Sequence, residues 1–142
     1  MPWAGLFTLV HVIAFVGWGL LLLGPRGPRT AAIILYFCVG LLCLAFAIMF
    51  ASQLREIAGG DFLSIQGIRR LFAGEAGIVI GWTHYLAFDL FIGQWIAKDA
   101  DHKGFSRVTQ APILLLTLLA GPMGLLIWLL IRERRARASA RG

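Results

Sequence analysis

The chain has 142 residues, of which 59% are hydrophobic and only 14% are charged. A typical soluble domain carries about 25% charged residues, so this composition excludes an ordinary soluble domain and indicates a multi-pass membrane protein. The formal net charge of +6 does not point to nucleic acid, because five of the thirteen basic residues are arginines that follow residue 131. Arginines in such a tail are typical of an anchor against anionic lipid headgroups, so membrane lipids are the expected partners.

Four apolar stretches are long enough to cross a bilayer as helices, which takes about 20 residues each. They lie at about residues 3–23, 31–51, 75–97 and 111–131. The first two are separated by a short run of glycines and prolines, which cannot continue a helix. We therefore expect an all-α fold: one four-helix transmembrane bundle over residues 1–131, followed by a basic, disordered tail over residues 132–142.

Residues 52–74, between the second and third spans, are polar and mix apolar with basic side chains. This pattern predicts an amphipathic segment that lies on the membrane surface. Four spans place both termini on one side. Eight basic residues fall on that side and five on the other, so the positive-inside rule predicts that both termini are cytoplasmic. Pro122, next to Gly121, is expected to kink the fourth span and free a backbone carbonyl inside the membrane.

Asp89 lies well inside the third span. An ionisable side chain there costs at least a few kcal/mol, so it requires either a partner or a purpose. On a helical wheel Asp89 shares a stripe with Trp82, and Tyr85 lies close by. Two interpretations stay open: a neutral or paired carboxyl group that ties helices together, and a proton donor or acceptor that faces a cavity.

His84 lies about 140° from Asp89 around the same helix, on a second stripe. This stripe also carries Phe88, Phe91 and Trp95. His11 in the first span is expected at nearly the depth of His84, so the two histidines could meet, although His11 is more simply a structural, hydrogen-bonded side chain. The depth of Asp89 predicts three neighbours that could donate hydrogen bonds to it. They are Tyr36, Cys38 and Thr117.

No metal or cofactor is expected. His11, His84 and Asp89 match a two-histidine, one-carboxylate set in ligand type only, and their offset in depth argues against a shared ion. The acidic and histidine residues after the third span are most simply a solvated loop. The chain also has no glycine-rich phosphate loop and no Gly-x-Ser-x-Gly turn, so nucleotide and serine-hydrolase chemistry have no support.

The run His-x-x-Ala-Phe-Asp-Leu-Phe at residues 84–91, together with Gly-Pro-x-Gly at residues 121–124, resembles the neoxanthin-synthase-like family, named for its abscisic-acid-deficient plant member. The resemblance covers residues 52–131 well and the first two spans mainly by layout. Plant members are plastid membrane proteins needed to convert violaxanthin to neoxanthin, which opens a 5,6-epoxide to an allenic alcohol. The resemblance implies a short bacterial relative, without a plastid transit peptide, in the inner membrane.

Such an isomerisation needs an acid at the epoxide oxygen and a base for a carbon-bound proton, without a redox cofactor. Our hypothesis is that Asp89 serves the ring oxygen while His84 or Tyr85 helps to move the proton of a carotenoid or other isoprenoid substrate. The residues expected to bind it are Trp82, Phe88, Phe91, Trp95, His11 and Thr117. Two alternatives stay open: a non-catalytic lipid- or pigment-binding protein, and a small transporter or assembly factor.

Overall fold

The computed structural model of the chain describes residues 2–139. Over these residues all regular secondary structure is helical. In chain order the elements are α1 (Trp3–Leu23), α2 (Pro28–Ala32), a π-helix (Ile33–Val39), α3 (Gly40–Ser52), α4 (Leu54–Ala58), α5 (Ile65–Leu71), α6 (Glu75–His102), α7 (Arg107–Leu119) and α8 (Gly121–Ser139). Three helices are long and apolar enough to cross a membrane: α1, the continuous helix Pro28–Ser52, and α6. The prediction of an all-α membrane protein is confirmed in this form.

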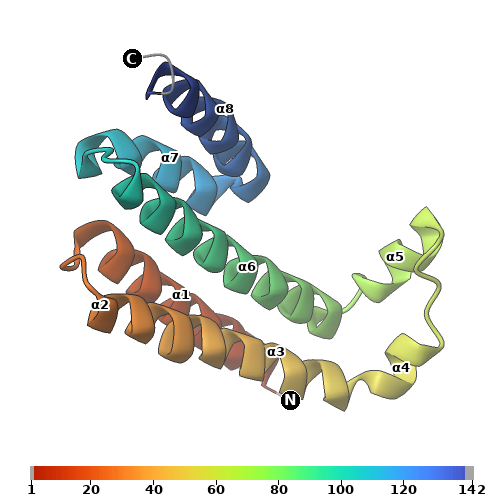
Figure 1. Cartoon of the computed structure of the whole chain (residues 1–142). Helices are drawn as coiled ribbons and strands as arrows, with labels where there is room; N and C mark the ends of the chain where they lie inside the picture. Colours follow the sequence, from red (N-terminus) through yellow and green to blue (C-terminus); the bar gives the residue numbers. More distant parts are fainter. Residues whose placement is uncertain (1, 140–142) are drawn as a thin grey trace.

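Helix α6 is the centre of the fold and packs against α1, α3, α7 and α8 (Figure 1). Its contact with α1 is close because each helix places a glycine opposite a large side chain of the other. A Cβ atom at Gly17 would collide with Leu90, and one at Gly93 would collide with the ring of Trp18. Small residues at helix contacts are the usual means of close packing inside membranes.

The predicted fourth span is wrong as a single helix. The chain breaks at Ala120, whose φ of −153° and ψ of 74° are not helical, so residues 111–131 belong to two helices. Helix α7 runs back along α6 as far as Leu119, and α8 then reverses direction (Figure 1). It returns to the end of α6, where Arg132 contacts Asp99. Together α7 and α8 form a helical hairpin.

The break has a local cause. Pro122 has no amide hydrogen, and inside a continuous helix its ring would clash with the carbonyl group four residues earlier. Gly124 then lets the two arms come together, because a Cβ atom there would collide with Thr117. The 13 residues of α7 extend about 20 Å, which is less than the hydrocarbon core of about 30 Å. Helix α7 by itself is therefore too short to cross the membrane.

The prediction that both termini lie on the cytoplasmic side assumes four single spanning helices, and the structure has a hairpin in place of the fourth. The start of α1 and the end of α8 lie at opposite ends of the bundle (Figure 1). The backbone of residues 132–139 continues α8, and residues 140–142 lie outside the described part of the chain.

The segment between α3 and α6 contains two short helices, α4 and α5, at one end of the bundle (Figure 1). Ser64 caps α5 by accepting a hydrogen bond from the amide of Gly67 at 3.0 Å. Asp61 in turn accepts hydrogen bonds from the Ser64 hydroxyl and the Leu63 amide. The location of this segment on the membrane surface remains a prediction.

Candidate functional site

Asp89 is buried, with 5% of its surface exposed, on the face of α6 that meets the hairpin. Its carboxyl group packs directly against Gly121, the first residue of α8, where a Cβ atom would collide with it. The start of a helix carries a partial positive charge, which favours an acidic group at this place. Oδ2 of Asp89 nevertheless has no hydrogen-bond partner within residues 2–139. A carboxyl oxygen is thus held inside the protein with unused capacity to give or accept a proton.

Tyr85 connects Asp89 to the tip of the hairpin. Its hydroxyl group donates a hydrogen bond of 3.1 Å to the carbonyl of Leu119, the last residue of α7, and it also interacts with the Asp89 carboxyl group. The break after Leu119 leaves carbonyl groups without their helical partners, and Tyr85 donates to one of them. Tyr85 therefore stabilises the tip of the hairpin and places a phenol beside the buried acid.

An aromatic line continues from Tyr85 to α1. The Trp82 ring stacks on Tyr85 with 5.2 Å between centroids, and its Nε1 donates to Nε2 of His11 at 2.9 Å. Nδ1 of His11 lies 2.8 Å from the carbonyl oxygen of Phe7. Because Nε2 accepts a hydrogen bond, the proton belongs on Nδ1, where it is donated to that carbonyl. The structure thus joins four of the predicted site residues in one connected group: His11, Trp82, Tyr85 and Asp89.

His84 lies on a different face of α6, as the helical wheel predicts. Its ring is 4.6 Å from that of Phe88 and 5.6 Å from that of Phe46 on α3. It contributes to a pocket of about 500 Å³ formed by α3 to α6. Phe88, Phe91 and Trp95 are each 40% or more exposed on the outside of the helix. The suggested meeting of His84 with His11 is therefore wrong, because the two rings point to different neighbours.

The three side chains predicted to donate hydrogen bonds to Asp89 do not act as its donors. The Thr117 hydroxyl group is fully buried but donates to the carbonyl of Ile113, four residues earlier on its own helix. Tyr36 is 77% exposed on the outside of the bundle, and Cys38 is buried on its own helix. These assignments assumed four spans of alternating direction, each a single helix that crosses the whole membrane. The reversal at Ala120 and the rotation of each helix about its axis determine which side chains of other helices face Asp89, whereas Tyr85 lies beside it one turn earlier on α6 itself.

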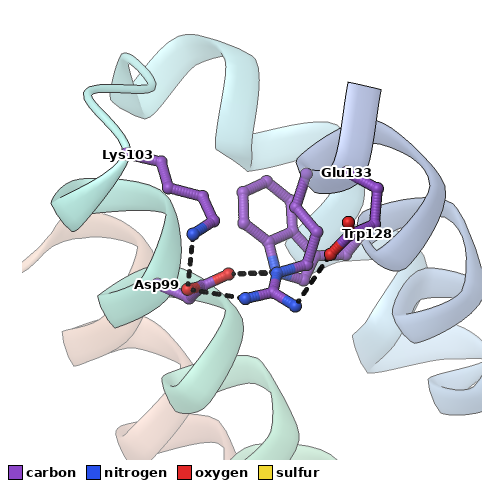
Figure 2. Close-up of polar contacts among 5 residues, drawn as sticks. Asp99, Lys103, Trp128 and Glu133 are labelled. Carbon is purple, nitrogen blue, oxygen red and sulfur yellow. Dashed lines mark hydrogen bonds and ion pairs between the residues drawn. The ribbon is translucent and has the colours of Figure 1, made fainter. Parts of the chain in front are cut away.

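A second polar cluster joins the hairpin to the end of α6, where sequence reasoning expected only a solvated loop (Figure 2). Oδ2 of Asp99 accepts hydrogen bonds from Nε of Arg132 at 2.7 Å and from Nε1 of Trp128 at 3.1 Å. Lys103 approaches the other carboxyl oxygen at 3.4 Å. No pattern in the sequence reveals this cluster, because it requires α8 to return alongside α6.

Gln110 organises the polar residues that neighbour this cluster. The buried amide of Gln110 donates to Asp101 at 2.7 Å and accepts from Arg26 at 2.9 Å. Arg107 donates to the carbonyl groups of Leu22 and Gly24, and so closes the end of α1. Across the described part of the chain, no three His, Cys, Asp or Glu side chains lie close enough together to hold a metal ion.

Comparison with known proteins bears on the whole arrangement. A family model described as ABA DEFICIENT 4-like matches residues 5–128, which is most of the chain. The matched region contains α6 and the tip of the hairpin, so the resemblance inferred from residues 84–91 and 121–124 is confirmed. Comparison with curated proteins and with solved structures gave no match.

Proposed function

Since the chain belongs to the ABA DEFICIENT 4-like family, we propose that it is a membrane isomerase that acts on a carotenoid or another isoprenoid lipid without a cofactor. The observation that carries the proposal is the unpartnered Oδ2 of Asp89, buried within a membrane-spanning helix beside Tyr85. Intramembrane acidic residues are generally functional rather than incidental. A purely structural carboxyl group would be expected to use both of its oxygens.

The proposed reaction opens a ring epoxide to an allenic alcohol. The Asp89 carboxyl group donates its proton to the epoxide oxygen as the carbon–oxygen bond breaks. A proton leaves the neighbouring carbon, and its bonding electron pair forms the new double bond. The Asp89 carboxylate receives that proton, either directly or through the Tyr85 hydroxyl group. Proton and electron counts balance, so no oxidant or reductant is required.

The contacts favour Tyr85 over His84 as the proton partner of Asp89. Tyr85 interacts with the carboxyl group, whereas His84 packs against Phe46 and Phe88 on the other face of the helix. Trp82 is 41% exposed to the membrane beside this group, and a polyene chain can stack on its ring. The ring end of the substrate would then meet Tyr85 and Asp89 at the tip of the hairpin.

A non-catalytic function as a lipid- or pigment-binding protein is the second candidate. It is favoured by the pocket of about 500 Å³ at His84, whose walls include the stacked rings of Phe46 and Phe50. This pocket does not include Asp89. A binding protein of this kind would retain an isoprenoid lipid during purification but would not convert it.

We also propose a bacterial cytoplasmic membrane as the location, with the end that carries α7 and α8 facing the cytoplasm. Among the basic residues whose backbone is described, nine belong to this end and three, Arg55, Arg69 and Arg70, belong to the other. The positive-inside rule favours the basic end as cytoplasmic. This orientation replaces the one expected from four spans.

The test is turnover of an epoxy-carotenoid by the protein reconstituted in liposomes, with products separated by chromatography. Asp89→Asn keeps the shape of the side chain but removes the acid, so turnover should fall by about 100-fold or more. Tyr85→Phe should lower turnover as well, while Asp101→Asn is a matched control on the same helix that should leave it unchanged. The catalytic proposal is abandoned if Asp89→Asn converts substrate at the wild-type rate. A pigment that copurifies with the wild-type protein and is not converted would favour the binding function.

A further inference from the structure

We propose that this protein has a binding site for the headgroup of an anionic phospholipid, separate from Asp89 and independent of the isomerase function. The site is a pocket of about 450 Å³ where the turn after α1, the π-helix and the last turns of α6 meet. Lys98, Thr30 and Arg26 supply its polar side, and Ile34, Leu35 and Tyr36 supply its apolar side. This combination matches an amphiphile whose phosphate group lies at the membrane surface.

The polar side has an unused positive charge. Lys98 is exposed and forms no ion pair with any residue in the described part of the chain. Arg26 lies 3.5 Å from Asp101, so its charge is partly balanced, but its Nε is buried without a hydrogen-bond partner within residues 2–139. Two basic side chains, Arg26 and Lys98, face the single carboxylate of Asp101 here, which leaves one positive charge without an acidic partner. A phosphate group would accept hydrogen bonds and balance this charge.

The apolar side is suited to acyl chains. Tyr36 is 77% exposed on the outside of the bundle, Leu35 is partly exposed, and the buried Ile34 forms part of the pocket lining. An acyl chain that lies across Tyr36 and Leu35 would stay in apolar surroundings, while the phosphate group of the same lipid reaches Lys98. A free anion would make contacts only with the polar side of the pocket.

The pocket exists because the helix is irregular there. Residues Ile33–Val39 form a π-helix, which is wider than an α-helix and is frequently found at functional sites. At its start, Nε2 of Gln94 on α6 donates a hydrogen bond of 2.6 Å to the carbonyl of Ala31. Gln94 and Ala31 both line the pocket. Gln94 thus satisfies the backbone carbonyl of Ala31 just before the π-helix, at the wall of the pocket.

The charge of this end of the bundle supports an anionic occupant. Nine basic residues with described backbone belong to it, against three at the other end. Each basic residue near a membrane surface strengthens the attraction for anionic lipid. The pocket at His84 lies at the other end, among α4 and α5, and does not share this charge.

The test uses the full chain in nanodiscs of phosphatidylcholine, alone or mixed with phosphatidylglycerol. Native mass spectrometry would count the lipids retained by the protein, and thermal unfolding would measure the stabilisation they give. We expect retention of phosphatidylglycerol to exceed that of phosphatidylcholine, and Lys98→Gln to weaken phosphatidylglycerol binding about fivefold. Lys98→Arg should keep the preference. Arg55→Gln, which removes the same charge at the other end, should also keep it.

Two results would overturn the proposal. One is a Lys98→Gln variant that retains phosphatidylglycerol as well as the wild-type protein does. The other is inorganic phosphate displacing the retained lipid or stabilising the protein as strongly as phosphatidylglycerol does, which would identify a site for free phosphate rather than for a lipid. Lys98 is exposed, so its substitution leaves the folded core intact.

Discussion

The Asp89 carboxyl group lies directly against Gly121, the residue at which α8 begins. This contact places the tip of the hairpin formed by α7 and α8 on the buried acid of α6. A side chain at residue 121 would push the hairpin away from α6, and with it the Leu119 carbonyl that Tyr85 holds. Glycine at this position is therefore a packing requirement of the candidate site.

Gly121→Ala should destabilise the protein, because its methyl group would collide with the Asp89 carboxyl group. Overpacking of this kind costs about 1–3 kcal/mol. Unfolding of the purified protein in mild detergent measures it. Gly19→Ala is the matched control, since a Cβ atom there meets nothing within 4 Å and should cost no stability. The cost of Gly121→Ala should shrink in an Asp89→Ala background, and an undiminished cost would place the clash elsewhere.

Arg132→Met should loosen the hairpin from α6. Nε of Arg132 donates to Asp99 at 2.7 Å with both side chains less than a quarter exposed, so its loss leaves a shielded carboxylate with fewer donors. We expect a loss of about 1–3 kcal/mol in the free energy of unfolding. Lys103→Met removes the same charge from a longer, 3.4 Å contact and should cost less than about 1 kcal/mol. Equal losses for the two variants would contradict the expectation that Arg132 contributes more to stability than Lys103 does.

If the hairpin of α7 and α8 leaves the membrane on the side from which it enters, it predicts which sites share a side of the membrane. Single cysteines at Val108, Glu133 and Leu63 can be labelled with an impermeant maleimide in intact cells or inverted vesicles, after Cys38 and Cys43 are replaced. Val108→Cys and Glu133→Cys should react from the same side, and Leu63→Cys from the other. Labelling of Glu133→Cys from the side of Leu63→Cys would instead support a fourth crossing helix.

The turn before α5 should respond to acid. Hydrogen bonds from the Ser64 side chain and the Leu63 amide hold the pKa of the Asp61 carboxyl group below its ordinary value of 3.8. A lowered pKa in the folded state means that the stabilisation is complete above pH 3.8 and disappears as the pH falls through the folded pKa. Hydrogen exchange at the Gly67 amide should report this loss of protection. In Asp61→Asn the protection should no longer depend on pH in this range.

Several features of the site follow from local patterns. The helical wheel places Trp82, Tyr85 and Asp89 on one side of α6 and His84 on another, and the structure has this arrangement. The wheel cannot give the rotation of one helix relative to its neighbour. His11 therefore bonds to Trp82 rather than meeting His84.

The sequence by itself determined that this is a helical membrane protein of a particular family with an acid inside its third crossing helix. Hydropathy, helical period and the motif at residues 84–91 are local properties, so they can be read without a structure. Only the tertiary structure decided that α7 and α8 fold back on each other as a hairpin, and that Gly121 lies against Asp89. Pro122 signals a bend, but the direction in which α8 leaves Ala120 depends on packing against α6 and on the distant Asp99–Arg132 pair.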